Sequence, residues 1–381
     1  MSTLKTSNIQ HASAASAAIT LDANGQATLN GLAYPTSGSL SGRNRIINGD
    51  MRIDQRNAGA SVTPTTSGTY ILDRWQAWLS QASKFSVQRN AGSITPPAGF
   101  TNYLGVTSLA ATSVGTNDYF SVNQCIEGFN VSDLAWGTAS ASPVTLSFWV
   151  RSSLTGTFSG AFTNGSNNRS YPFTYSIASA NTWERKTVTI SGDTSGTWAS
   201  DNTQGLYIQF SLGMGSTYNG TAGAWAAGQF LSATGATSVV GTNGATFYIT
   251  GVQLEAGSVA TPFERRSYGQ ELRLCQRYYW APINGSSNTL GVAFGGGGTN
   301  KAYHPVVFPV EMRAAPTVGI TSTVCLDNNG GLSYYSSHSL AFPSPISVQV
   351  MFTASTTVVV NDPYNVRGTD GSSRYNFSAE L

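Results

Sequence analysis

Charged side chains are scarce in this chain of 381 residues. Asp, Glu, Lys and Arg make up only 10% of it, against roughly 25% in a typical soluble domain. The formal net charge is +2, and the sequence contains no cluster of Lys and Arg. Because nucleic acids are recognised through basic patches, this charge distribution gives no basis for a nucleic-acid partner.

Histidine and cysteine are also rare. The three histidines stand in no nucleophile motif and form no pair at the i, i+4 spacing of a helical metal site. The cysteines, Cys125, Cys275 and Cys325, are odd in number and widely spaced, which argues against a disulfide framework and a cysteine-based metal site. We therefore expect three buried free thiols and folding in a reducing cytosol.

Long hydrophobic runs are missing as well. No stretch approaches the roughly 20 apolar residues that a membrane helix needs. The first residues also lack the continuous apolar segment of a secretory signal peptide. The sequence predicts a soluble protein with neither an export signal nor membrane insertion.

Short strand patterns fill most of the chain instead. Hydrophobic residues make up 40% of it, and Gly, Ser, Thr and Asn are frequent between them. This mixture is typical of many strands joined by glycine-bearing turns. Strands are expected at 51–55, 70–79, 85–89, 145–151, 187–190, 207–212 and 247–254. Because no helical pattern separates them, they predict an all-β fold, an antiparallel β-sandwich of the jelly-roll type.

The hydrophobic period changes after the last of these strands. Ser267 and Gln270 fit a capping box, which satisfies free amides at a helix start, and Pro282 ends the helix. The residues expected on its buried face are Tyr268, Leu272, Cys275 and Tyr279. The chain then returns to strands, expected at 306–310, 317–321, 346–352 and 356–360. A short helix is thus expected to lead into a second, smaller β domain.

Three regions follow from these patterns: a segment 1–42, a jelly roll 43–265, and the helix with the second β domain at 266–381. The first region is rich in Ser, Ala, Thr and Gly, with a hairpin signal at Asn24-Gly25 between Ile19 and Leu29. It cannot bury a core alone. We expect it to order by adding to another chain, as an oligomerisation or docking segment. Disorder of the free segment is the alternative.

Four stretches resemble a family of bacteriophage tail-fibre and receptor-binding proteins. They are NRIINGD at 44–50, LDRW at 72–75, TGVQLEAGSVATPFERRSYGQELRLCQRYY at 250–279 and FPVEMRAAPTV at 308–318. The third is the most specific, and together they span most of the chain beyond residue 43. The order of the first three is also similar to that in carbohydrate-binding jelly-roll modules. Loops vary freely in this family, so the resemblance identifies no binding residue.

The resemblance implies a virion protein made in the host cytoplasm and displayed on the particle exterior. Its expected partners are two further copies in a homotrimer, a phage tail or head adaptor bound through residues 1–42, and a host surface glycan. One alternative is a structural connector or decoration fibre without glycan binding. A second is a polysaccharide depolymerase.

No constellation of residues favours catalysis. A glycosidase needs two carboxylates flanking the scissile bond, and the spacing of the 18 acidic residues singles out no pair. The prediction is a protein that is not an enzyme and requires no cofactor. Similar jelly rolls often hold a structural calcium ion, and Asp50 and Glu255 are the matching acids here. The alternative is that both carboxylates cap turns or pair with arginine.

Loop aromatics give the functional signal. A flat ring can cover the apolar face of a sugar while loop amides and hydroxyls bond its edge. Trp198, Tyr218 and Trp225 lie in stretches rich in Gly, Ser and Thr, where packing explains a large ring less well, and Asp201 and Asn202 are near in sequence. These five residues are the candidate glycan-binding set. A loop-anchoring role or burial at a subunit interface is the alternative. Tyr334, Tyr335 and Tyr364 are rival sites in the last region.

Overall fold

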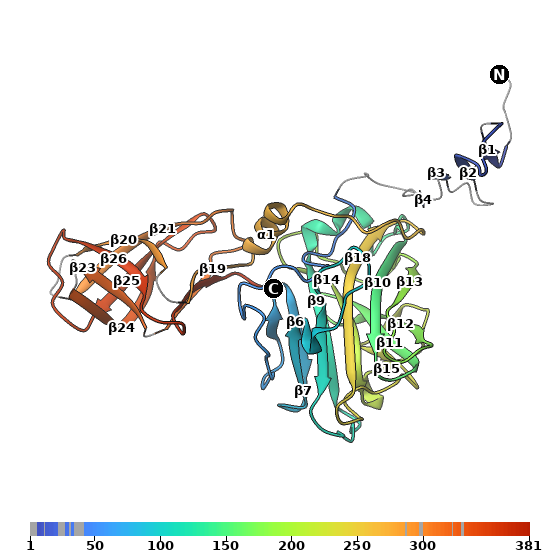
Figure 1. Cartoon of the computed structure of the whole chain (residues 1–381), viewed down its shortest axis with the longest axis horizontal. Helices are drawn as coiled ribbons and strands as arrows, with labels where there is room; N and C mark the ends of the chain where they lie inside the picture. Colours follow the sequence, from blue (N-terminus) through green and yellow to red (C-terminus); the bar gives the residue numbers. More distant parts are fainter. Residues whose placement is uncertain are drawn as a thin grey trace. The chain divides into compact units, whose positions relative to one another are not determined.

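The computed structural model describes residues 6–10, 12–21, 27–29, 32–33, 42–285, 288–296, 300–321, 323–328 and 331–381. The chain forms two compact units (Figure 1). The sandwich unit comprises Met1–Arg52, Gly59–Ile71 and Trp75–Arg266, and the barrel unit comprises Ile53–Ala58, Leu72–Arg74 and Ser267–Leu381. Strands dominate both, so the predicted all-β fold is confirmed. No helix among the described residues is long and apolar enough to cross a membrane.

Two antiparallel sheets build the body of the sandwich unit. The first has the order β13 (Glu184–Ile190), β10 (Val144–Ser152), β18 (Thr246–Ala256), β8 (Leu104–Ser108) and β7 (Phe85–Arg89). The second has the order β16 (Ala226–Ala227), β12 (Arg169–Ile177), β11 (Gly156–Asn164), β14 (Gln204–Met214), β9 (Tyr119–Glu127), β6 (Trp75–Leu79) and β5 (Thr69–Leu72). Short 3-10 turns lie at η1 (Ala91–Ser93), η2 (Gly128–Asn130) and η3 (Ser132–Leu134).

Aromatic side chains from the two sheets meet in one core. Phe148 on β10 packs edge-on against Phe210 on β14, with ring centroids 5.0 Å apart. Phe158 on β11 stacks on Phe247 of β18 at 6.2 Å. Alternate residues of each strand therefore point inward, as the period-two patterns predict, and the predicted sandwich is confirmed.

The NRIINGD stretch runs along the closing strand β18. The Arg45 amide donates to the Leu254 carbonyl at 2.8 Å, and the Val252 amide donates to Gly49 at 2.9 Å. A Cβ atom on Gly49 would lie 2.2 Å from the Val252 carbonyl oxygen, so only glycine fits this approach. The predicted strand at 51–55 is wrong: positive φ angles at Asn48 and Met51 turn the chain there, and the stretch is irregular.

The helix α1 (Tyr268–Gln276) begins where the capping box predicts. The Ser267 hydroxyl accepts the Gln270 amide at 3.3 Å. The predicted buried face is wrong at its ends, because Tyr268 is 58% exposed and Tyr279 already belongs to the next strand. Glu271 and Cys275 are the buried residues of this helix. All three cysteines are buried and free, which confirms that prediction.

Nine strands complete the barrel unit. A closed antiparallel barrel has the order β20 (Thr289–Gly295), β21 (Lys301–Val307), β25 (Ser347–Ala354), β24 (Gly331–Ala341), β23 (Val324–Asn328) and β26 (Pro363–Gly368). A three-stranded sheet contains β19 (Tyr279–Asn284), β27 (Arg374–Ser378) and β22 (Thr317–Ile320). The predicted strand at 356–360 is wrong: this stretch is a loop that buries Val358 and exposes Val359 and Val360.

The first residues form a separate four-stranded sheet of β1 (Asn8–Ile9), β2 (Ile19–Leu21), β3 (Ala27–Leu29) and β4 (Leu32–Ala33). The predicted hairpin is confirmed, since Ile19 pairs with Leu29 and Leu21 with Ala27. Its turn at Asn24-Gly25, and His11, lie outside the described residues. The described side chains of β1 and β2 are exposed or half-buried, so this sheet encloses no core of its own.

Candidate functional site

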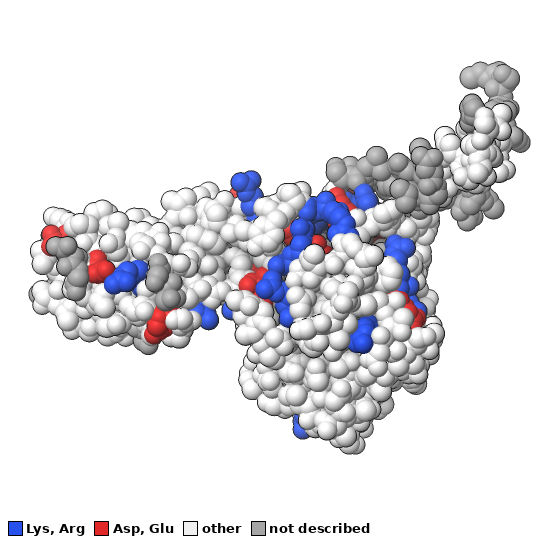
Figure 2. Space-filling view, in the orientation of Figure 1, with Lys and Arg blue, Asp and Glu red and all other residues white. Residues whose placement is uncertain are grey.

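A pocket of about 230 Å³ opens at one end of the seven-stranded sheet. Its lining consists of Ser67, Trp78, Tyr119, Tyr218, Gln229 and Leu231. We call it the aromatic pocket. Three of its six residues carry rings and none carries a charge. The face of the molecule drawn in Figure 2 likewise has broad uncharged areas between a few groups of charged side chains.

Tyr218 is brought to the pocket by the short 3-10 turn η4 (Ser216–Tyr218). The turn follows β14 directly, and the Thr217 amide donates to the Thr116 carbonyl at 3.1 Å. A Cβ atom on Gly215 would lie 2.2 Å from that same carbonyl oxygen, so glycine permits the approach. The ring of Tyr218 then meets Tyr119 edge-on, with centroids 5.4 Å apart.

A carboxylate outside the lining fixes this end of the sheet. Asp118 accepts hydrogen bonds from the Ser80 hydroxyl and the Gln81 amide, each at 2.7 Å, and from the Gly115 backbone amide at 2.8 Å. The bond from Ser80 is the main cause that lowers the pKa of Asp118. These bonds tie the end of β6 to the start of β9, which holds the pocket wall in place.

Residues 219–240, the covering loop, close the far side of the pocket. Its strands β15 (Asn219–Gly220) and β17 (Ser232–Ala233) pair in parallel. The Leu231 amide donates to the Tyr218 carbonyl at 2.8 Å, so Leu231 and Gln229 are held at the pocket wall. Further along, the Ala233 amide donates to the Ser159 hydroxyl of β11 at 2.7 Å. The loop therefore occupies the outer face of the sheet beyond the pocket.

Three amide side chains lie in a row beside the pocket. Gln76 on β6 pairs with Asn123 on β9, and Asn123 pairs with Gln209 on β14, so all three point to the outer face of the sheet. We call them the amide row. Above it, Trp78 of β6 meets Tyr207 of β14 across the intervening strand, with ring centroids 5.0 Å apart. These two rings give the row an aromatic cover.

Buried polar atoms on this face have no hydrogen-bond partner among the described residues. They are both polar atoms of the Asn123 and Gln209 amides and the Ser121 hydroxyl. Each such group costs about 1–3 kcal/mol of stability. Ser121 stands directly opposite Trp78 in the ladder and two residues along from Tyr119, so it belongs to the pocket end of the face. Buried groups of this kind typically bind an ordered water.

Polar edges surround the rings of the aromatic pocket. Among the described residues, neither the phenols of Tyr119 and Tyr218 nor the Gln229 amide form a hydrogen bond with another side chain. Flat rings can cover the apolar face of a sugar, while phenols and an amide bond its hydroxyls. The arrangement therefore suits a small neutral polyol.

The structure separates the predicted glycan-binding aromatics. Tyr218 lies in the pocket, whereas Trp198 and Trp225 pack edge-on with Trp136, at 4.8 and 5.2 Å between ring centroids. The Trp225 indole donates to the Ser191 carbonyl at 2.7 Å, and the Trp198 indole to Ser195 at 3.2 Å. These bonds correspond to the alternative expected for them, loop anchoring.

The two polar members of the predicted set lie beside that tryptophan cluster in sequence. Asp201 is fully exposed, and its pKa is lowered first by the hydrogen bond from the Thr203 hydroxyl. Asn202 is half-buried. Neither residue lines the aromatic pocket.

The two predicted calcium ligands have different protein partners. Asp50 is buried and pairs with Arg52 at 2.5 Å; burial raises its pKa, and Arg52 opposes that shift. Glu255 accepts the Thr261 hydroxyl at 2.6 Å and the Gln253 amide at 2.9 Å. No group of three or more His, Cys, Asp or Glu that could hold a metal occurs in the part of the chain that the structure describes. The calcium site stays a prediction.

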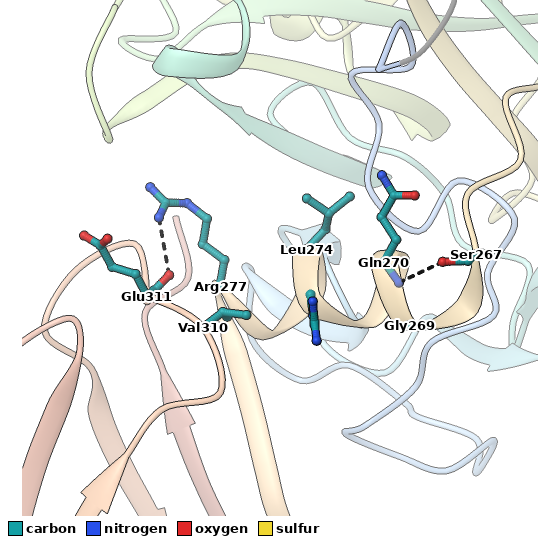
Figure 3. A pocket seen from close by; sticks show the side chains of 8 residues that line it. Ser267, Gly269, Gln270, Leu274, Arg277, Val310 and Glu311 are labelled. Carbon is teal, nitrogen blue, oxygen red and sulfur yellow. Dashed lines mark hydrogen bonds between the residues drawn. The ribbon is translucent and has the colours of Figure 1, made fainter.

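A second hollow, of about 550 Å³, follows the exposed side of α1 in the barrel unit (Figure 3). Gln270, Leu274 and Arg277 project from the helix, and Val310 and Glu311 form the other wall. An Arg277 nitrogen donates to the Glu311 carbonyl at 3.4 Å. The hollow contains no buried polar group without a partner, so it is the weaker candidate.

Sequence reasoning missed most of the pocket. Trp78, Tyr119, Gln229 and the amide row were not among the predicted residues. The sequence holds one signal that identifies Trp78. Trp75 and Trp78 are three residues apart on one strand, so the period of two puts their side chains on opposite faces of the sheet. Trp75 is fully buried in the core and Trp78 is not.

No protein-family model and no curated protein matches this chain. Solved structures with similarity include the enzymatically active domain of tailspike protein 4 from bacteriophage CBA120, at 13% identity and a TM-score of 0.30. That match covers 56% of this chain and 21% of the tailspike chain. A putative sugar-binding protein from Bacteroides thetaiotaomicron matches at 12% identity and a TM-score of 0.34, over 56% of this chain and all of that one.

A family 11 carbohydrate-binding module from Clostridium thermocellum, solved with a mixed-linked tetrasaccharide, is also similar. It has 9% identity and a TM-score of 0.26, over 54% of this chain and all of that one. At these TM-scores the similarities carry no argument about function.

Proposed function

We propose that this chain is a bacteriophage fibre protein that binds a glycan of the host cell surface in the aromatic pocket of its sandwich. The observation that carries the proposal is the combination of uncharged rings with polar groups that lack partners. Trp78, Tyr119 and Tyr218 offer flat faces, and the Gln229 amide and the two tyrosine phenols offer hydrogen bonds. The sequence resemblance to tail-fibre proteins supports the viral setting.

The barrel unit supports self-association into a homotrimer. Phe342, Val307 and Ile346 are 85%, 73% and 61% exposed, the highest values among large hydrophobic residues of the described chain. Val307 pairs with Ser347, and the Phe308 amide donates to the Ile346 carbonyl, so the exposed residues lie at one end of the barrel. We call these three residues the apolar tip.

A second copy of the chain is the occupant that fits the apolar tip. Residues 331–361 contain no Asp, Glu, Lys or Arg. Around a symmetry axis each residue meets its own copies, so a charge there would face the same charge. Phe342 also has a φ of +51°, a conformation that costs a bulky residue about 1–3 kcal/mol. Contact with identical copies offsets this cost.

Attachment to the particle is assigned to residues 1–42. The sheet β1–β4 has mainly exposed side chains in its described part and no core, which suits a segment that completes itself on a tail or head adaptor. The protein would then be displayed on the virion exterior. A trimer raises a weak affinity per site by about 10²-fold through avidity.

Binding without catalysis is the proposed chemistry. No lining residue of the pocket is a carboxylate, and Asp118 behind it is engaged by Ser80, Gln81 and Gly115. A depolymerase needs two carboxylates at the scissile bond. Incubation with host capsule or lipopolysaccharide should therefore release no oligosaccharide, and release of fragments would replace the binding proposal with the enzymatic one.

The test is retention of the purified protein on immobilised envelope polysaccharide from candidate hosts. The wild type should be retained, and Tyr218→Ala should lose most of the retention because it removes one wall of the pocket. Tyr334→Ala is the matched control, since Tyr334 is 42% exposed on the barrel. Loss of retention with Tyr334→Ala alone would place the binding site on the barrel unit. No retention on any host fraction would end the proposal.

A further inference from the structure

The aromatic pocket is closed in a way that limits what it can hold. We infer that it takes a single uncharged sugar residue at the end of a glycan chain, inserted end-on, and does not hold a stretch of chain along the sheet. This inference rests on the proposed glycan binding and adds the class of ligand to it.

The covering loop provides the first argument. Its amides at Ala233 and Phe230 donate to the Ser159 hydroxyl on β11 and the Ser170 hydroxyl on β12, at 2.7 and 3.1 Å. Both hydroxyls lie on the same outer face as the amide row. The part of the face beyond β14 is therefore occupied by the chain itself. An extended glycan lying across the strands would have to displace this loop.

The size of the pocket provides the second argument. Its volume is about 230 Å³, below the roughly 300–1,000 Å³ of pockets that enclose drug-sized ligands. Gln229 and Leu231 of the covering loop stand on one side, and Trp78 and Tyr119 of the sheet on the other. One ring fits such a space, and the rest of the glycan would extend into solvent.

Charge provides the third argument. The lining holds three aromatic residues, a serine, a glutamine and a leucine, and no cation that could neutralise an acidic sugar. The nearest acid in sequence is Asp118, whose pKa is lowered mainly by the Ser80 hydroxyl, so it stays ionised. Lys84 acts on Asp118 as a nearby positive charge, so the preference against a uronic acid follows mainly from the lack of a cation in the lining. Neutral sugars are therefore favoured.

The polar groups beside the rings are uncharged, which also favours a neutral sugar. The Gln229 amide and the two tyrosine phenols belong to the lining, and none of them forms a hydrogen bond with another described side chain. Neutral side chains of this kind match sugar hydroxyls, each of which both donates and accepts.

The test titrates the full chain with glucose, galactose, mannose and N-acetylglucosamine, then with glucuronic and galacturonic acids, by saturation-transfer NMR. Oligosaccharides carrying each neutral sugar at the non-reducing end follow. One neutral monosaccharide should bind within about threefold of the oligosaccharide that ends in it, and the uronic acids should bind at least about tenfold more weakly, as expected for a charge desolvated without a partner. Tyr218→Phe should weaken binding about fivefold by removing one hydrogen bond.

Tyr334→Phe is the matched control and should leave the affinity unchanged, since Tyr334 is an exposed residue of the barrel unit and does not line the pocket. Affinity that rises tenfold or more with chain length would overturn end-on binding and leave the proposed function intact. Equal binding of uronic acids would overturn the preference for neutral sugars. Failure of every oligosaccharide and every host polysaccharide would instead remove the proposed function itself.

Discussion

The sandwich unit and the barrel unit treat apolar surface in opposite ways. Among described residues, the sandwich exposes only two large hydrophobic side chains beyond residue 42, Leu109 and Phe129, whereas the shorter barrel unit exposes ten. The sandwich instead places three rings, those of Trp78, Tyr119 and Tyr218, in the aromatic pocket. The barrel leaves Phe342 almost fully exposed at a strained backbone position.

We propose that this difference reflects two roles in one chain. A pocket with unsatisfied polar groups is suited to a small polar ligand, because hydrogen bonds specify it. A bare apolar tip without charge is suited to a large partner that covers it, and copies of the same chain meet that condition. We therefore assign recognition to the sandwich and assembly to the barrel.

Introducing a charge at the apolar tip should have the largest effect, because it should abolish the assembly that we assign to the barrel unit. Phe342→Glu would place like charges face to face around the symmetry axis, at a cost of several kcal/mol. Light scattering should give three times the chain mass of 40.0 kDa for the wild type and a single chain mass for the variant. Phe129→Glu, at a position 57% exposed on the sandwich, is the control and should remain trimeric. A monomeric wild type would contradict assembly through the barrel.

The next largest effect concerns ion pairs, whose contribution to the free energy of unfolding should differ between the two units. Arg74 in the barrel unit is 1% exposed, pairs with Glu380 and lies 3.6 Å from the ring centre of Tyr278. Arg74→Met should lower the free energy of unfolding by about 2 kcal/mol, because the buried Glu380 carboxylate loses one of its two ion-pair partners, Arg74 and Arg56. The measurement is urea unfolding.

Arg45→Met in the sandwich is the matched change. Its partner Asp133 has a side chain that is 55% exposed, so the loss should stay below about 1 kcal/mol. Equal losses for Arg74 and Arg45 would show that burial does not distinguish the two pairs.

The pH dependence of the barrel unit should combine two opposing groups. Burial raises the pKa of Asp73 to about 6, so the folded state holds this proton more tightly and stability falls as pH rises from 3.8 to about 6. Burial lowers the pKa of His304 to about 4, so stability rises as pH rises from about 4 to 6.5. In the wild type the two slopes oppose each other.

Single variants should separate these slopes. In Asp73→Asn the urea midpoint should rise from about pH 4 to about pH 6.5, and in His304→Gln it should fall over nearly the same range. Identical profiles for both variants would mean that neither group titrates between its folded and unfolded pKa values.

The smallest effect is expected in the amide row. Both polar atoms of Gln209 lack a described partner, so Gln209→Leu should be neutral or stabilise by up to about 1 kcal/mol. Gln253 in the opposite sheet is the control: its amide donates to Glu255 at 2.9 Å and its oxygen accepts the Glu264 amide at 2.7 Å. Gln253→Leu should cost about 2 kcal/mol by leaving these groups unpaired. A similar loss at both positions would show that Gln209 is satisfied.

Local patterns predicted much of the fold. The strand at 85–89 and the helix start at Ser267 follow from alternation and capping, which depend on a few neighbouring residues. The errors arise where tertiary structure overrides the pattern. Residues 51–55 alternate between apolar and polar side chains, but the positive φ of Met51 turns the chain out of an extended conformation. In the loop 356–360 only Val358 of the three valines is buried.

The candidate site was largely beyond prediction because it is non-local. Tyr119 and Tyr218 meet although 99 positions separate them, and Gln229 arrives on a loop that folds back over the sheet. The stretches that resemble tail-fibre proteins contribute to packing instead. Arg45 and Gly49 form backbone hydrogen bonds with β18, and the Arg313 guanidinium donates to the Ala379 and Glu380 carbonyls. They therefore indicate the fold without indicating where a ligand binds.

Fluorine NMR of protein labelled with 5-fluorotryptophan tests the central claim most directly. The chain has eight tryptophans, so eight signals can be assigned with single Trp→Phe variants. On addition of the retained host glycan, the Trp78 signal should shift while those of Trp136, Trp198 and Trp225 stay in place. A shift of the Trp198 or Trp225 signal with Trp78 unmoved would contradict the account and place the glycan at the tryptophan cluster.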